Sequence, residues 1–292
     1  MGFYDSLYGL IGGLFPYEWA HSTFVLRALI GLLLLTPLCG AMGIMVVNFR
    51  MAFFSDTISH SAFTGIALGL LFGVNPWITL VAFGVVVGLG IIRVKKHSEL
   101  STDTVIGVFF STVIAIGIAI ISVRRGLSRD LQSYLFGDIL TINEAELTAM
   151  IALFVVAFIF IWLTYNKLLM IGLHEDLASS KGFNTTLYEY AFSAILAIVV
   201  TFSIRAVGLL LVTALLILPA ASARNMARSS GALFWWSILF SLISGVLGLA
   251  GSLIWNMATG ASVILAASAL FVLTNLASFI RHMKGRHVSP VN

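Results

Sequence analysis

Charged residues and cysteines are scarce in this sequence. Of its 292 residues only 10% are charged and 60% are apolar, and Cys39 is the single cysteine. One cysteine cannot form an internal disulfide, which excludes a disulfide-stapled secreted scaffold. About a quarter of the residues in a soluble domain are charged, and a soluble domain with so few would expose large apolar patches. These shortages exclude a soluble enzyme and a disordered regulator, and they indicate an all-α polytopic membrane protein.

Several sequence motifs are missing as well. The first 20 residues contain Asp5 and Glu18 and have no basic segment before an apolar run, so we expect no cleavable signal peptide. No G-x-x-x-x-G-K-[ST] motif occurs, so the chain has no nucleotide-binding P-loop of its own. The net charge of +4 comes from charges scattered between apolar blocks. This distribution is typical of membrane loops and does not indicate nucleic-acid binding.

Apolar blocks of membrane-spanning length recur along the chain. A transmembrane helix needs about 20 predominantly apolar residues. The blocks between charges predict nine spans, with eight to ten allowed, at 28–47, 56–73, 76–92, 104–122, 147–165, 188–204, 206–222, 232–252 and 261–280. In two pairs of neighbouring blocks, 28–47 with 56–73 and 188–204 with 206–222, a re-entrant or broken element is an alternative to two complete spans. We expect one transmembrane domain over 1–292, with an N-terminal interfacial segment at 1–22 and a basic, frayed tail at 281–292.

The positive residues set the predicted orientation. Segments on the side of the loop 93–103 hold 11 Lys and Arg, and those on the other side hold 5. Because Lys and Arg favour cytoplasmic loops, the first side and the C-terminus are predicted to be cytoplasmic. The outer loop 123–146 and the inner loop 166–187 are the longest connections. The inner loop contains a short predicted helix with Glu175 and Asp176 at its start and Gly182 at its end.

An acid and an imidazole share one face of the second block. Asp56 and His60 are four residues apart, so a helix places them one turn apart on the same face. Ionisable groups inside an apolar span are costly and usually face a partner or a cavity. They either satisfy each other as a structural pair or bind a divalent cation through oxygen and nitrogen. Two ligands from one copy are few, but two copies related by a two-fold axis supply four.

Small residues run beside that polar face. Thr64 extends the polar stripe by one turn, and small residues at every fourth position, Ser61, Gly65, Gly69 and Gly73, let another helix approach closely. Whether that helix belongs to the same chain is left open. Later in the chain, Pro219 is expected to break or kink a helix end, and such breaks often line pathways.

The stretch from Arg50 to Gly69 resembles the signature of the membrane subunit of ATP-binding-cassette importers for zinc, manganese and iron. Matching residues in this stretch are Arg50, Met51, Phe53, Phe54, Asp56, His60 and Gly65. Thr64 departs from the pattern, which has a bulkier apolar residue or a proline there. Further similar segments follow in the same order at Tyr134–Leu140, Glu175–Gly182, Leu215–Arg224 and Thr259–Ala261. The segment Arg129–Asp138 is most similar to the zinc-uptake branch.

The resemblance implies a homodimeric permease with a type II importer-like helical fold in a bacterial inner membrane. It implies two separate ATPase subunits docked at Glu175, Asp176 and Gly182, and an extracytoplasmic metal-binding protein on the other side. The transported metal, with zinc favoured, would pass Asp56 and His60 at or near the dimer axis, and no tightly bound cofactor is expected. Thr64, Gly65, Gly69 and Pro219 are predicted to line or pack this path.

Three alternative functions remain at the level of the sequence. The same machine could carry manganese or iron, because several divalent metals accept this pair of ligands. An intramembrane metalloenzyme would need more ligands and a catalytic base, and no H-E-x-x-H motif occurs. A secondary transporter usually needs more intramembrane acids than the one clear case at Asp56.

Overall fold

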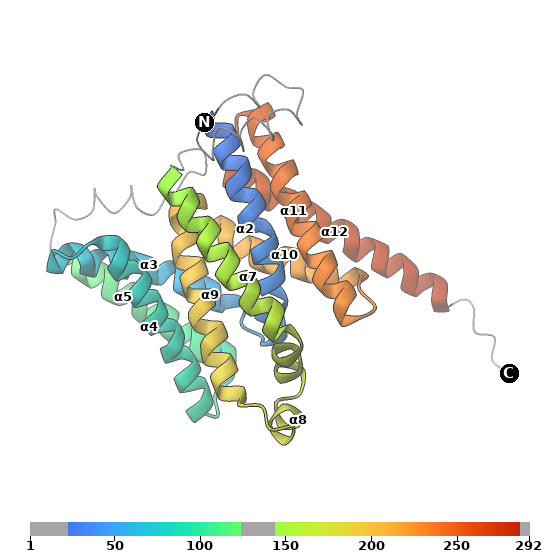
Figure 1. Cartoon of the computed structure of the whole chain (residues 1–292), viewed down its shortest axis with the longest axis horizontal. Coiled ribbons are helices and arrows are strands. Elements are labelled where there is room, and N and C mark those ends of the chain that lie inside the picture. The colour runs from blue at the N-terminus through green and yellow to red at the C-terminus, as the bar shows by residue number, and fades with distance from the viewer. Residues whose placement is uncertain (1–22, 124–143, 287–292) are drawn as a thin grey trace.

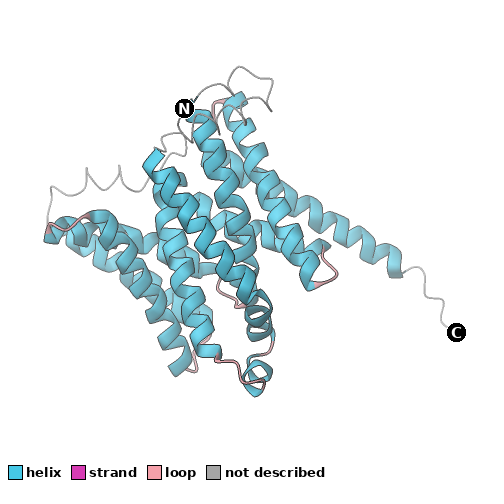
Figure 2. Ribbon diagram, viewed as in Figure 1, coloured by secondary structure: helices cyan, strands magenta, loops and turns pink. Residues whose placement is uncertain are grey.

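Helices form all of the regular structure in the described residues. The structure is a computed structural model that describes residues 23–123 and 144–286. Its helices are α2 (Thr23–Asn48), α3 (Ala52–Phe72), α4 (Pro76–His97), α5 (Thr102–Val123), α7 (Glu144–Leu173), α8 (Glu175–Ser180), α9 (Thr185–Val207), α10 (Leu209–Met226), α11 (Ser230–Trp255) and α12 (Thr259–Arg286) (Figure 1). No strand is found within these two ranges (Figure 2). The expected all-α fold is therefore confirmed.

Seven of these helices are long and apolar enough to cross a membrane. The two other long helices are α3 and α10. The apolar part of α10, Leu210–Met226, is short, whereas α3 has 21 residues but carries Asp56, His60 and five Ser or Thr residues. Each of the nine predicted blocks falls on one of the nine long helices, and the blocks and helices differ by up to eight residues at their ends.

Some helix ends differ from the predicted boundaries. The predicted span 147–165 ends before Asn166 and Lys167, yet α7 continues to Leu173. Lys167 is accommodated because its Nζ donates a hydrogen bond to the Tyr188 hydroxyl at 2.8 Å. The inner connection therefore reduces to α8 and its flanking residues, and α12 likewise continues to Arg286 through half of the predicted frayed tail. The N-terminal segment 1–22, most of the outer loop 123–146 and the end of the tail lie outside the described residues.

The two pairs of blocks that allowed a broken element connect tightly. Three residues separate α2 from α3, and among them Arg50 has a positive φ of 54°. A single residue, Gly208 with φ 81°, separates α9 from α10. The second pair is thus a broken element with almost no connecting loop.

The metal-candidate helix α3 lies inside a group of helices. It packs against α4, α5, α9 and α10, while α2 packs against α7, α10 and α11. In Figure 1, α3 to α5 lie on one side of the molecule and α11 and α12 on the other. Phe54, Ile58 and Ile66 of α3 are fully buried. Packing of this apolar side thus fixes the orientation of α3, and this orientation determines where its polar side chains lie relative to α4 and α5.

Candidate functional site

The structure places Asp56 and His60 near the start of α3. The helix begins at Ala52, after Met51, and the Phe54 amide donates to the Met51 carbonyl at 3.0 Å. Asp56 and His60 then lie one turn apart on the same helical face, as the spacing predicts. Both side chains are partly buried, and the preceding Phe53 is 63% exposed. The pair therefore sits at the edge of the helix group and remains accessible.

The same polar stripe faces α5. The His60 ring meets the Phe110 ring edge-on, with 5.1 Å between centroids. One turn further, the buried Thr64 hydroxyl donates a 2.6 Å hydrogen bond to the Val113 carbonyl. Among the described residues no hydrogen bond or ion pair joins Asp56 to His60, so the self-satisfied structural pair is not observed. Their carboxylate and imidazole remain available to a third group.

One copy of the chain offers few metal ligands. The described residues contain no group of three or more His, Cys, Asp or Glu side chains that could hold a metal. Asp56 and His60 supply one oxygen and one nitrogen, whereas zinc prefers four ligands. A complete ligand set therefore requires donors beyond those that the described part of one copy brings together.

The small-residue stripe packs on α4 of the same chain. A Cβ atom on Gly65 would lie 2.8 Å from the Cα of Leu80, and one on Gly69 would lie 2.8 Å from the Cα of Pro76. Gly73 meets nothing there and instead ends α3 with φ 68°. The question left open by the sequence is thus answered: the helix that approaches Gly65 and Gly69 is α4.

Pro219 is buried in the middle of α10, which runs without interruption from Leu209 to Met226 and contacts α3, so Pro219 does not end a helix as the sequence predicted. In the described part of the chain no hydrogen bond or ring contact connects Pro219 to Asp56 or His60. Gly43 of α2 comes close to the Leu216 backbone one turn before Pro219, so this stretch of α10 is tightly packed. Its role in a pathway stays a prediction.

The short inner helix α8 ends as the sequence predicts. Gly182 has φ 80°, the Phe183 amide donates to the Ala178 carbonyl at 3.2 Å, and the Gly182 amide donates to the Ser179 carbonyl at 2.9 Å. These two bonds form a Schellman motif, in which glycine adopts the left-handed conformation without a Cβ clash. Ala178 is buried and Leu177 is 56% exposed. One side of α8 therefore packs on the protein and the other is free.

Glu175 attaches α8 to the end of α4. Its Oε1 lies 3.0 Å from Lys96 Nζ and accepts a 3.3 Å hydrogen bond from the Thr185 hydroxyl. Partial burial alone would raise the pKa of the Glu175 carboxyl, but the hydrogen bond and positive charge of Lys96 outweigh it and lower that pKa. Asp176 is exposed. The two acids expected to act together thus have different surroundings.

The sequence reasoning missed a second buried acid. Glu189 of α9 is 3% exposed, and its Oε2 lies 3.5 Å from Lys95 Nζ and 3.4 Å from Lys96 Nζ. A carboxylate inside the predicted block 188–204 was the signal that could have found it. The expectation that Asp56 is the one clear acid within the apolar blocks was therefore incomplete.

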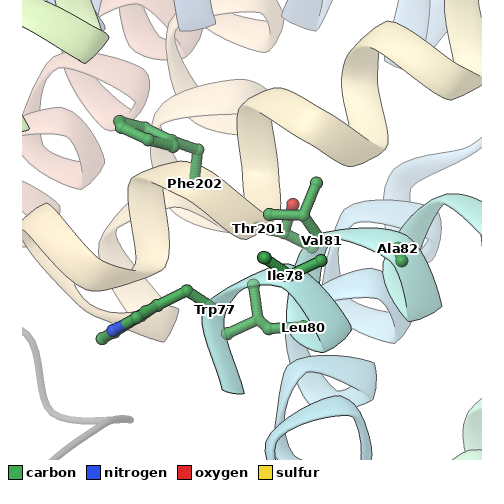
Figure 3. A pocket seen from close by; sticks show the side chains of 7 residues that line it. All are labelled: Trp77, Ile78, Leu80, Val81, Ala82, Thr201 and Phe202. Carbon is green, nitrogen blue, oxygen red and sulfur yellow. The ribbon is translucent and has the colours of Figure 1, made fainter. Parts of the chain in front are cut away.

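An apolar pocket of about 430 Å³ lies between α4 and α9, away from these polar groups. Its lining residues are Trp77, Ile78, Leu80, Val81, Ala82, Thr201 and Phe202 (Figure 3). The Thr201 hydroxyl already donates to the Ala197 carbonyl at 2.7 Å. With no titratable side chain in its lining, the pocket has no ligand for a metal ion.

Known proteins resemble the chain over most of its length. It is 32% identical over 250 residues to the high-affinity zinc uptake system membrane protein ZnuB of Haemophilus influenzae, covering 85% of this chain and 95% of ZnuB. It is 30% identical over 251 residues to the manganese transport system membrane protein MntC of Halalkalibacterium halodurans, covering 86% of each.

Structure and family comparisons agree with these relatives. A chain in the solved structure of PsaBC from Streptococcus pneumoniae in complex with Fab superposes with a TM-score of 0.74 and 30% identity, covering 91% of this chain and 94% of that one. The family described as the ABC 3 transport family matches residues 21–278. Seven apolar helices of spanning length and this match make the chain a multi-pass membrane protein that belongs to the ABC 3 transport family.

Proposed function

We propose that this chain is the permease subunit of an ATP-driven importer that brings zinc across a bacterial inner membrane. The observation that carries the proposal is the accessible Asp56 and His60 pair on α3, a helix enclosed by the apolar helices of the chain. The relatives support it, because one is named as a zinc uptake membrane protein and another as a manganese transport membrane protein. The chain itself moves the ion, and separate subunits hydrolyse ATP.

Two copies of the chain complete the proposed ion path. Asp56 and His60 of both copies, brought together near a two-fold axis, offer two carboxylate and two imidazole ligands. This number suits zinc, and homodimers are the commonest symmetric assembly. A site built from such sparse ligands also binds weakly enough to release its ion, as conduction requires.

The free side of α8 is the proposed docking point for the ATPase. Asp176 and Leu177 are exposed there, and the turn at Gly182 projects beside them. The positive-residue bias puts this side in the cytoplasm. Two ATPase subunits would dock on the two copies, and a metal-binding protein would deliver the ion at the opposite side of the membrane.

Substitutions at the ligand pair test the proposed path. His60→Ala and Asp56→Asn should each lower zinc uptake by cells at least tenfold while the permease remains in the membrane at normal levels. His97→Ala is the matched control, because His97 is exposed and its Nδ1 lies 2.8 Å from the Arg93 carbonyl oxygen of its own helix. Normal uptake by both ligand variants would overturn the assignment of the path.

Manganese is the second candidate cargo, and the named manganese relatives favour it. A competition assay distinguishes the two metals. Uptake of labelled zinc is measured at increasing manganese concentrations, and uptake of labelled manganese is measured at increasing zinc concentrations. Zinc uptake that is unaffected by equal manganese supports the zinc proposal. Uptake of manganese that excess zinc fails to inhibit would assign the machine to manganese.

Docking of the ATPase has its own test. The charge reversal Asp176→Lys and the bulky substitution Gly182→Trp should each reduce co-purification of the ATPase or uncouple its hydrolysis from uptake. Gly231→Trp is the control, since Gly231 also lies in open space at a helix end. Full uptake with full ATPase retention in both variants would contradict docking at α8.

A further inference from the structure

A buried carboxylate joins α9 to the last turn of α4. Glu189 of α9 is almost fully buried, and its Oε2 makes ion pairs of 3.5 Å with Lys95 and 3.4 Å with Lys96 in the last turn of α4. The same oxygen has no hydrogen bond. A buried ion pair adds little to the free energy of unfolding compared with apolar packing of the same size. We therefore look for a role of this pair in transport.

Lys96 is shared between two acids on different elements. Its Nζ lies 3.4 Å from Glu189 on α9 and 3.0 Å from Glu175 on α8. Thr185, at the start of α9, donates to the same Glu175 oxygen. The last turn of α4 is thus tied to the short helix α8 and to the base of α9 through one ammonium group.

The other half of α4 is in backbone contact with α3. Gly65 and Gly69 of α3 leave no room for a side chain against Leu80 and Pro76 of α4. Glycines on α4 are also tightly packed, because a Cβ on Gly88 would lie 3.1 Å from the Phe54 ring of α3 and one on Gly84 would collide with the Thr201 side chain of α9. A helix packed this closely along its length transmits displacement instead of absorbing it.

We infer that Glu189 is a positioning residue that holds Lys96 against Glu175, so that Lys95, Lys96, Glu189 and Glu175 form an ionic latch joining α8 to α4 and α9, through which a displacement of α8 moves the helix that carries Asp56 and His60. The inference rests on the proposed function, since the displacement would come from the ATPase. The latch itself acts within this chain. Breaking the latch should leave the ATPase bound and the metal ligands intact, but ATP hydrolysis should no longer drive zinc import.

The first experiment measures coupling. Glu189→Gln keeps the size of the side chain and removes its charge. In permease reconstituted with its ATPase and metal-binding protein, we expect the number of zinc ions imported per ATP to fall at least fivefold, with the ATPase still co-purifying. Glu99→Gln is the matched control, because Glu99 is exposed on the same side of the membrane. An unchanged import-to-hydrolysis ratio in Glu189→Gln would overturn the latch.

A double-mutant comparison tests whether the groups act as one unit. Lys96→Gln should reduce the same ratio, and the double variant with Glu189→Gln should be no worse than the more damaged single variant. Losses that multiply would mean that the two residues act separately, which contradicts the latch. Lys95→Gln leaves the Lys96–Glu175 contact in place and should cause a smaller loss. Lys95→Gln also replaces Glu189→Gln in this test if the Glu189→Gln protein is poorly produced.

The last measurement depends on no partner and separates this inference from the proposed function. A spin label at position 180 reports the mobility of α8 in the permease alone, and Cys39 is buried and so does not compete for labelling. Glu189→Gln should increase the mobile fraction at least threefold, and Glu99→Gln should not change it. If that fraction stays constant, the latch is wrong even when uptake assays support the transport function. If it rises while no metal is transported, the transport proposal alone fails.

Discussion

At the scale of single residues, Gly182 determines how α8 ends. Its φ of 80° places it in the left-handed region, which costs a residue with a Cβ about 1–2 kcal/mol. Gly182→Ala should therefore loosen the end of α8 and raise the mobile fraction of a spin label at position 180 about fivefold, as expected for about 1 kcal/mol. Gly231→Ala, at a position with open space and no positive φ, should leave it unchanged. Equal effects of the two variants would contradict the role of φ.

Thr64 has a packing role that can be separated from transport. Thr64→Val removes the hydrogen bond to the Val113 carbonyl and keeps the shape of the side chain, so we expect a loss of about 1 kcal/mol. The midpoint of thermal unfolding in detergent should fall by about 2–4 °C. Thr112→Val, at an exposed position of α5, should not lower it. If uptake is lost while the midpoint is unchanged, Thr64 belongs to the ion path instead.

Residue spacing predicts some of these roles and hides others. Asp56 and His60 could be placed on one helical face because helix periodicity is a local property. Glu189 was missed because it lies at the edge of an apolar block, where a charge is usually solvated. Its ion-pair partners, Lys95 and Lys96, lie far earlier in the chain, and no local pattern encodes that contact.

At the scale of the element, the attachment of α8 should depend on pH. The pKa of Glu175 is lowered in the folded protein, so its ion pair with Lys96 adds stability above the ordinary carboxyl pKa of about 4.3. That stability is lost as the pH falls through the lowered pKa. A spin label at position 180 should stay immobile from pH 7 to about 5 and become mobile only at more acidic pH.

The control for this pH response is Glu175→Gln, which cannot titrate at that position. Its label should be more mobile than that of the parent already at pH 7, and its mobility should change less on acidification. A parent protein whose α8 becomes mobile between pH 7 and pH 6 would contradict the lowered pKa. Such an early change would assign the response to a histidine.

Most helices could be predicted from the sequence, but their neighbours could not. The nine apolar blocks match nine helices because apolarity and length are readable along the chain. The end of α7 was predicted too early, since Lys167 is held by Tyr188, which lies on another helix. The partner of the Gly65 and Gly69 stripe required the structure, because any close helix would satisfy the pattern.

At the scale of the whole molecule, a shared ion site predicts the behaviour of mixed dimers. A dimer with one wild-type copy and one His60→Ala copy keeps three of the four proposed ligands. If both copies contribute to one site, such dimers, isolated through two different tags, should import less than a tenth of the wild-type amount. Import at one half would mean that each copy has its own path, and the proposed axis would be wrong.

The sequence was sufficient to predict the fold class of the molecule, but it was not sufficient to predict how two copies would be arranged. Low charge and repeated apolar blocks are sufficient to predict a helical membrane protein, and the match to the ABC 3 transport family agrees with the resemblance of Arg50–Gly69. The described part of one copy, however, contains no group of three or more His, Cys, Asp or Glu side chains that could hold a metal ion. The arrangement of a second copy depends on surfaces that local periodicity does not encode.

The polarity of α3 also has a consequence for the biogenesis of the protein. Unlike its neighbours α4, α5 and α9, α3 is not among the helices long and apolar enough to cross a membrane, and two of the helices that enclose it, α9 and α10, are synthesised much later. About 135 residues separate the end of α3 from the end of α9, which corresponds to roughly 7–27 s of translation at about 5–20 residues per second. We therefore expect α3 to insert together with α4, which follows it directly in the chain and fits against Gly65 and Gly69. The same glycines that fix α3 against α4 in the folded protein would then also hold the two helices together during insertion.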